Sequence, residues 1–142
     1  FRSRSGSPGT GSTLIVIDAS AVVEMLLGSA KGWKVEQRVL GSGESLHAPH
    51  LLDLEVTQVI RRYLQAKALT PSRAQMAFDD FRALKYRRYP HDVLLKRIWS
   101  LRDNFTAYDA AYLALAEEIG ATVVTCDGKM AGSGHNAKVE VV

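Results

Sequence analysis

Two aspartates in this sequence each follow directly on a short apolar run that is rich in β-branched residues. Residues 14–17 lead into Asp18, and residues 121–126 lead into Asp127. Runs of this kind are typical of strands that are covered on both faces, as in a parallel sheet. Because ligands of open parallel sheets bind just beyond the carboxyl ends of the strands, the two carboxylates indicate a site that holds a cation.

Each of these aspartates also has a purely structural interpretation. Asp18 stands where a helix N-cap is expected, although Ser20 competes for that role. Position alone leaves the two interpretations of Asp18, cap and ligand, equally open. Asp127 precedes Gly128, and Asp-Gly is a common turn pair, so a turn is favoured for Asp127 when it is considered alone.

Two further acids are expected to point inward from helices. Asp109 lies three residues after Thr106, as in a capping box, and at about 100° per residue it lies on the apolar side of its helix. Glu55 lies on the apolar stripe of residues 51–64, with Asp53 nearer the edge of that stripe. An unpaired carboxylate is costly in such a position. For Glu55, a buried ion pair with Arg or Lys is the main alternative.

Together, the four acids are better explained by one cation than by four separate structural roles. No basic residue is identified at a matching inward position. Clustered carboxylates repel one another, which raises their pKa values unless a cation lies among them. Carboxylates without histidine or thiolate partners suit Mg²⁺ or Mn²⁺. Acid-rich sites for such ions are typical of phosphodiester hydrolysis, in which the metal activates a water and neutralises the phosphate.

The elements that position these acids alternate between strands and helices. Strands are expected at residues 14–17, 45–48, 86–89, 121–126 and 139–142, and helices at 19–27, 33–40, 50–66, 71–85, 92–102 and 107–119. Thr70 and Thr106 provide N-caps, while Gly28 and Gly120 end their helices. This alternation predicts one α/β domain with a mostly parallel sheet.

Composition and charge place the chain among ordinary globular proteins. Its 142 residues suffice for one domain, and its 46% hydrophobic content argues against disorder. Residues 1–12 are interpreted as an expression-tag remnant, which leaves 13–142 as the domain. Because this remnant contributes two arginines to the net charge of +3, the charge is no argument for nucleic acid. The single cysteine, Cys126, favours a cytoplasmic location, and no apolar run approaches the roughly 20 residues of a membrane span.

Four segments are similar to those of a known family. They read IDASAVVEMLL at 17–27, APHLLDLEV at 48–56, LRDNFTAYDAAYLALAEEIGA at 101–121 and TVVTCDGKM at 122–130. With them, nearly the whole chain from residue 14 resembles a PIN-domain ribonuclease, specifically a VapC-type toxin of a type II toxin–antitoxin system. The resemblance implies a three-layer α/β/α sandwich and a Mg²⁺- or Mn²⁺-dependent endoribonuclease that cleaves RNA. It also implies a cognate VapB-type antitoxin, with the chain in a homodimer or a toxin–antitoxin hetero-oligomer.

The resemblance further implies an acidic metal cluster that neutral polar side chains support. The cluster consists of Asp18, Glu55, Asp109 and Asp127. The supporting side chains are Ser20, Asn104 and Thr125. Among the acids, Asp18 and Asp109 are expected to bind the metal directly, and the other two to bind it directly or through water. The hydroxyls are expected to orient carboxylates or water. The asparagine is expected to contact the phosphate or a loop.

Two other functions compete with RNA cleavage. A phosphatase of the haloacid dehalogenase type also places an aspartate after its first strand, but it needs a second aspartate where this chain has Ser20. A catalytically silent PIN module that binds RNA or protein is expected to have lost one or more acids, and all four are present. The stretch 85–89 interleaves cations with aromatics, as phosphate-binding segments do, but a solvated edge strand is slightly favoured there.

Overall fold

A parallel sheet forms the centre of the molecule. The computed structural model describes residues 14–41 and 43–142, so the expected tag remnant at 1–12 lies outside the described residues. Within them, five strands pair in parallel in the order β3-β2-β1-β4-β5. The strands are β1 (Leu14–Ile17), β2 (Ser45–Pro49), β3 (Arg87–Tyr89), β4 (Thr122–Thr125) and β5 (Lys138–Val141).

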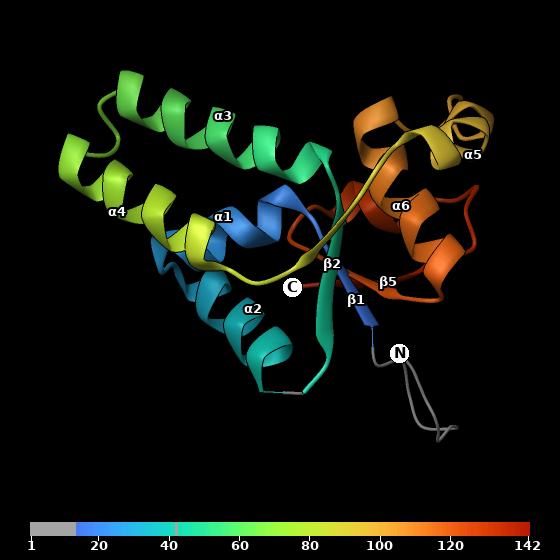
Figure 1. The fold of residues 1–142 in the computed structure, drawn as a ribbon, viewed down its shortest axis with the longest axis horizontal. Coiled ribbons are helices and arrows are strands. Elements are labelled where there is room, and N and C mark those ends of the chain that lie inside the picture. The colour runs from blue at the N-terminus through green and yellow to red at the C-terminus, as the bar shows by residue number, and fades with distance from the viewer. Residues whose placement is uncertain (1–13, 42) are drawn as a thin grey trace.

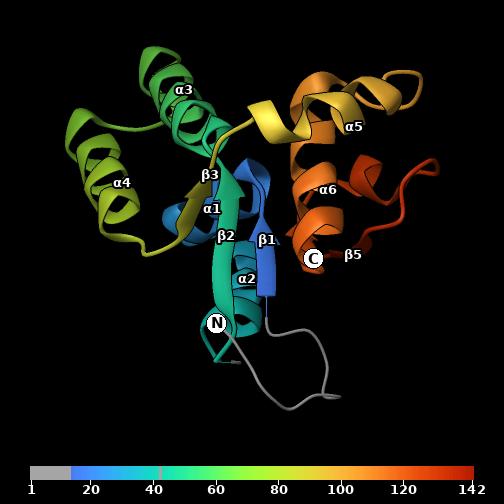
Figure 2. The same cartoon turned by 45° about the vertical axis from the view of Figure 1, so that its right-hand side comes forward.

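Helices cover both faces of this sheet (Figures 1 and 2). On one side lie α1 (Ala19–Leu27), α2 (Ala30–Leu40), α3 (Leu51–Gln65) and α4 (Pro71–Ala83). On the other side lie α5 (Leu95–Ser100) and α6 (Ala107–Ile119). Two short 3₁₀ turns, η1 (Asp92–Leu94) and η2 (Gly128–Ala131), complete the elements. The expected three-layer α/β/α sandwich with a parallel sheet is therefore confirmed.

The core explains why the first and fourth strands are so apolar. Strand β1 lies between β2 and β4, and its residues Ile15, Val16 and Ile17 are fully buried. Helix α6 contacts β1, β2 and β4, and seven consecutive residues of that helix, 110–116, are buried. With apolar neighbours on both faces, the strands gain from β-branched side chains in every position. None of the helices in the described part of the chain has the length and apolarity needed to cross a bilayer.

Three helices differ from the expected boundaries by two residues or more, and one of them is α4, which ends at Ala83 instead of residue 85. Helix α2 begins at Ala30 instead of residue 33, because the Ser29 hydroxyl caps it by accepting a hydrogen bond from the Gly32 amide at 2.9 Å. Gly32 is needed here, since a Cβ would lie 1.9 Å from the carbonyl oxygen of Glu24 in α1. The helix expected at 92–102 is instead the 3₁₀ turn η1 followed by the short α5, which ends at Ser100.

Candidate metal centre at the carboxyl edge of the sheet

Asp18 occupies the end of the central strand and is almost completely buried. It follows β1 and is the N-cap of α1, with 6% of its surface exposed. Its Oδ1 accepts hydrogen bonds from the Ser20 hydroxyl at 2.8 Å and the Ala21 amide at 3.0 Å. Its Oδ2 accepts one from the Thr125 hydroxyl at 2.5 Å. Since a carboxylate has about four acceptor positions, Asp18 serves as the helix cap and still has capacity for a ligand.

Neighbouring strands bring the supporting hydroxyls to Asp18. The register pairs Ile17 of β1 with Val124 of β4, so the residues that follow them meet at one edge of the sheet. The hydroxyls of Ser20 and Thr125 lie 3.2 Å apart, and the Ser20 hydroxyl also accepts a hydrogen bond from the Cys126 amide at 3.0 Å. The structure thus places both expected hydroxyl residues against the carboxylate, where they fix its orientation.

Asp127 begins η2 at the end of β4. Its Oδ1 accepts a hydrogen bond from the Lys129 amide at 3.0 Å, and its own amide donates to the Thr125 hydroxyl at 2.9 Å. The Lys129 ammonium lies 3.8 Å from Asp127 Oδ2, but this lysine is largely exposed, so solvent weakens the pair. The turn interpretation of Asp127 therefore holds, and the same residue contributes charge to the edge where Asp18 lies.

Glu55 approaches the same edge from α3, with a tyrosine hydroxyl as its hydrogen-bond partner. It is partly buried, and its Oε1 accepts a hydrogen bond from the Tyr112 hydroxyl of α6 at 2.6 Å. Among the described residues no ion pair involves Glu55, so the buried Arg or Lys partner considered from the sequence is not observed. Burial raises the pKa of Glu55; the Tyr112 hydrogen bond opposes this rise, and the charges of Asp109 and Asp18 add to it.

Asp109 reaches the cluster from the first turn of α6. Its amide donates to the Thr106 hydroxyl at 3.1 Å, as expected for a helix capped by that threonine. The Asp109 side chain is partly buried. Burial raises its pKa, and the nearby charge of Asp127 adds to the rise, whereas Lys129 and the Thr106 hydrogen bond oppose it.

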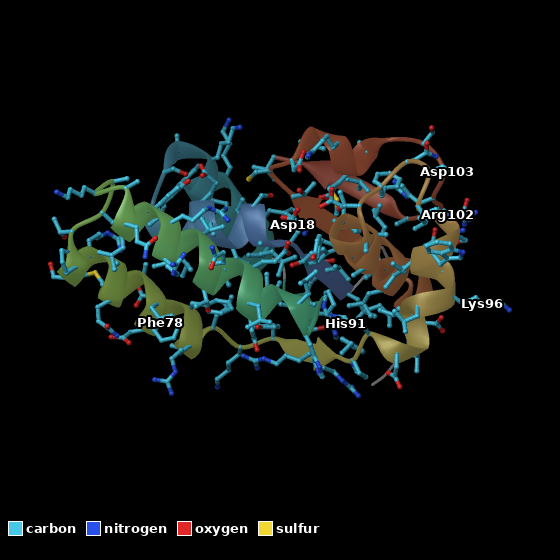
Figure 3. All side chains as sticks on the ribbon, turned by 90° about the horizontal axis from the view of Figure 1, so that it is seen from above. Asp18, Phe78, His91, Lys96, Arg102 and Asp103 are labelled. Atoms are coloured by element: carbon cyan, nitrogen blue, oxygen red, sulfur yellow. The ribbon has the colours of Figure 1, made fainter. Side chains whose placement is uncertain are left out.

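The four acids lie close enough for their charges to affect one another's pKa values. Burial raises the pKa of Asp18; hydrogen bonds from Thr125, Ala21 and Ser20 oppose the rise, and the charge of Asp127 adds to it. Three carboxyls with raised pKa values, each sensing another acid, describe a site with excess negative charge. In Figure 3 Asp18 lies in the middle of the view from above, between the α3–α4 side and the α6 side.

This donor set fits a hard divalent cation in its chemistry. It consists of carboxylates and hydroxyls, which are the ligands that Mg²⁺ and Mn²⁺ prefer. In the described residues no three acidic, imidazole or thiol side chains already converge on one point at coordination distance. The charge of a cation bound among these acids would offset the repulsion that raises their pKa values.

Two polar residues near the cluster in sequence lie elsewhere in space. Asn104 is exposed and packs against the loop at Gly134, where an added Cβ would come within 2.6 Å of the asparagine Nδ2. Of its two expected roles, the structure places Asn104 at a loop. Asp53, two residues before Glu55, receives hydrogen bonds from Arg88 and Tyr86, so its charge is used to fasten α3 to β3.

The basic stretch at 85–89 and the histidines have local structural roles. Arg88 stacks on the Tyr86 ring at 4.4 Å, and β3 is one of the two edge strands of the described sheet, which matches the favoured interpretation of this segment. His47 is buried and hydrogen-bonds the Tyr89 hydroxyl at 2.7 Å. His91 accepts a hydrogen bond from the first amide of α3, at 3.0 Å. The other ring nitrogen of His47 lies 2.7 Å from the Ser45 hydroxyl of β2, so the contacts of these two histidines are with β2, β3 and the start of α3.

Sequence reasoning missed two residues of the site, Tyr112 and Lys129. Tyr112 is 1% exposed, although a tyrosine hydroxyl needs a partner when buried. Its position three residues after Asp109 places both side chains on one face of α6, and that spacing was the available signal. Lys129 follows Asp127 by two residues and forms an ion pair with it. It lies outside the helices expected from the sequence, so the angular position of residues on a helix gave no indication of it.

Comparison with known proteins assigns the family. Residues 15–132 match the PIN domain model. Ribonuclease VapC12 of Mycobacterium tuberculosis is 39% identical over 130 residues, which cover 91% of this chain and 99% of the relative. Ribonuclease VapC9 of the same organism is 39% identical over 122 residues, covering 86% and 92%.

Solved structures agree on the fold. The crystal structure of PAE2754 from Pyrobaculum aerophilum superposes with a TM-score of 0.64 at 20% identity, covering 88% of this chain and 82% of the other. That of Mycobacterium tuberculosis VapC20, described as a sarcin-ricin loop cleaving toxin, superposes with a TM-score of 0.64 at 17% identity, covering 86% and 96%. Taken with the sequence matches, these likenesses show that the chain belongs to the PIN-domain family and, within it, to the VapC ribonucleases.

Proposed function

We propose that this protein is a metal-dependent endoribonuclease toxin that a VapB-type antitoxin neutralises. The observation that carries the proposal is the electrostatic coupling of the four acids: burial and the charges of neighbouring acids raise the pKa values of Asp18, Glu55 and Asp109, and Asp127 is one of those neighbours. The VapC ribonucleases to which the chain is similar support RNA as the substrate. They favour a nuclease over the phosphatase alternative. The cytoplasm is the proposed place of action, which the single cysteine favours.

The four acids have different proposed roles in binding the cation. Asp18 and Asp109 are the proposed direct ligands of Mg²⁺ or Mn²⁺, and Glu55 and Asp127 complete the cluster directly or through water. A bound cation of this kind lowers the pKa of water and neutralises charge on a phosphodiester. The Ser20 hydroxyl donates to one oxygen of Asp18, and the Thr125 hydroxyl of β4 donates to the other. The remaining acceptor position of this carboxylate therefore points in a fixed direction.

The proposed reaction is hydrolysis of an RNA phosphodiester. A water attacks phosphorus in line with the bond to the 3′ oxygen, that P–O bond breaks, and the products carry a 5′-phosphate and a 3′-hydroxyl. Glu55 is held by the Tyr112 hydroxyl and has no cationic partner among the described residues, so it is available to orient the attacking water or its proton. Asn104, which lies at the Gly134 loop, is proposed to contact the RNA phosphate away from the acidic cluster.

Assembly with a second copy or with the antitoxin is also part of the proposal. Exposed apolar side chains gather on α5 and the start of α6, where Leu95, Trp99 and Tyr108 are each more than half exposed. Contiguous apolar surface of this kind is typical of protein–protein contacts. It supports a homodimer or a toxin–antitoxin hetero-oligomer in which this surface is covered.

Sequencing of RNA 5′ ends after induced expression tests the activity and identifies the target together. We expect new 5′-phosphate ends at defined positions in cells that express the intact chain, and none of them in cells that express Asp18→Asn at the same level. Co-expression of a cognate VapB-type antitoxin is expected to suppress the same ends. Identical ends in both cultures, or no new ends with the intact chain, would contradict the proposal.

The hydrogen bond between Tyr112 and Glu55 leads to a second prediction, which concerns the rate of RNA cleavage. Tyr112→Phe removes the hydroxyl that holds Glu55 and leaves the ring in place, so we expect kcat for RNA cleavage to fall by about 10–100-fold, the usual cost of losing a group that orients a ligand. Tyr108→Phe, in the same helix but on its exposed side, is the matched control and is expected to cut at the normal rate. Equal rates for the two variants would remove Tyr112 from the proposed site.

A further inference from the structure

An open cavity of about 400 Å³ adjoins the carboxylate cluster on its α1–α3 side. Its volume falls in the range of roughly 300–1,000 Å³ typical of small-ligand sites. The cavity is lined by the first turns of α1, the start of α2, the second half of α3 and the residue after β4. None of the four acids of the cluster lines it, so it is a separate space with its own side chains.

Ser20 and Cys126 connect this cavity to the cluster. Both line the cavity, and the Cys126 amide donates to the Ser20 hydroxyl at 3.0 Å. The same hydroxyl donates to Asp18 Oδ1 at 2.8 Å. One side chain therefore lies between the cavity and the carboxylate that is proposed to hold the metal. An RNA strand that reacts at Asp18 would therefore pass close to this cavity.

The other walls combine apolar surface, an aromatic ring and positive charge. Val23 and Val59 supply the apolar part, and Tyr63, which is 36% exposed, supplies the ring. Arg62 and Lys31 are exposed at the rim, and no ion pair holds either of them within the described ranges 14–41 and 43–142. An aromatic face beside unpaired cations is the combination that binds single-stranded nucleic acid, because bases stack on the ring and phosphates pair with the cations.

The charge within the cavity is unevenly distributed. Glu24 of α1 also lines it and accepts a hydrogen bond from the Ser29 hydroxyl at 2.7 Å. This carboxylate disfavours a phosphate at the α1 end, where Lys31 is its neighbour in the wall. Arg62 presents its charge from α3, the same helix that presents Tyr63. The phosphate is therefore best held at the α3 wall, with the base extending over the ring toward the apolar side.

We infer that this cavity is a nucleotide subsite, which holds the unit of single-stranded RNA next to the scissile bond, with its base on Tyr63 and its phosphate on Arg62. The inference rests on the proposed RNA cleavage and adds to it a determinant of substrate binding. It makes Arg62 and Tyr63 substrate-binding residues outside the acidic cluster, so their loss weakens RNA binding and leaves the hydrolytic step intact.

Kinetics of Arg62→Gln and Tyr63→Ala on a single-stranded RNA that contains the mapped cleavage site test the inference. We expect KM to rise about tenfold in each variant, the size of one lost stack or phosphate contact, with kcat changed by less than about threefold. Arg62→Gln is also expected to reduce the slope of log KM against log salt by about 1. Tyr63→Phe retains the ring and is expected to restore the normal KM.

Arg61→Gln is the matched control, since it removes the same charge one residue earlier in α3 and does not line the cavity. It is expected to keep KM within about twofold, and melting temperatures verify that all variants are folded. If the unmodified chain cleaves the RNA and Arg62→Gln and Tyr63→Ala match Arg61→Gln, the subsite is refuted while RNA cleavage stands. Loss of antitoxin inhibition with unchanged RNA kinetics refutes it too, since the cavity then binds protein. If the unmodified chain cleaves no RNA, both proposals fail.

Discussion

Replacing Asp18 with asparagine is expected to lower the rate of RNA cleavage by roughly 10³-fold or more while the fold remains intact. Loss of one group that stabilises a transition state already costs about 10²–10³-fold, and this change also weakens the hold on the cation. Asparagine keeps the size of the side chain and an oxygen that accepts from the Ala21 amide, so the cap of α1 persists. Initial rates on the mapped RNA, with circular dichroism and melting temperature, measure both expectations.

Asp53→Asn provides the matched control for this prediction. Asp53 is an acid in the same helix as Glu55, but its charge is engaged by Arg88 at 2.8 Å. Burial raises the pKa of Asp53, and the hydrogen bonds from Arg88 and Tyr86 outweigh this and lower it, as expected for a carboxylate held in an ion pair. We expect Asp53→Asn to cleave RNA at nearly the normal rate. A folded Asp18→Asn variant that cleaves as fast as Asp53→Asn would show that Asp18 is not a ligand.

Removal of divalent cations is expected to abolish cleavage completely. Dialysis against a chelator leaves the carboxylates without a charge partner, and addition of Mg²⁺ or Mn²⁺ is expected to restore the rate. The control is NaCl added at the same ionic strength, which screens charge but is not expected to restore cleavage. Cleavage that persists at the normal rate in chelator would contradict the metal-dependent mechanism.

Thermal unfolding measures the same binding without any reaction. A ligand that binds only the folded state at about 100 times its Kd stabilises a protein by about 2.7 kcal/mol, which raises the melting temperature by several degrees for a chain of this size. We expect Mg²⁺ to produce this rise in the unmodified chain and in Asp53→Asn, and a much smaller rise in Asp18→Asn and Asp109→Asn. Equal rises in all four proteins would place the cation away from the cluster.

Much of the fold was predictable because its signals are local. Thr70 and Thr106 cap their helices as expected, with each hydroxyl accepting from the amide three residues later. The two buried strands that end in acids also lie where their β-branched composition predicted them. The errors are local as well. The start of α2 depends on the Ser29 cap and on a close approach to α1, and neither leaves a periodic pattern in the sequence.

The candidate site was predictable in its residues and much less in its contacts. The angular positions of Glu55 and Asp109 on their helices predicted that both side chains point inward, and both are partly buried. The angular position of a residue shows which face of the helix it lies on, but not which side chain of another helix faces it. This is why the Tyr112 hydroxyl was missed as the partner of Glu55. Asp53 and Glu55 lie two residues apart, yet one is in an ion pair with β3 and the other faces the cluster.

The sequence by itself determined which residues carry negative charge to the ends of buried strands and the inner faces of helices. Composition and periodicity are sufficient for this, because burial is a property of each element. Only the tertiary structure decided how these residues meet. The parallel register of β1 and β4 puts the Thr125 hydroxyl on Asp18, 107 residues away, and the packing of α3 against α1 forms the cavity beside it. Such contacts depend on the relative placement of elements, which is set by the packing of the whole core and not by any single segment.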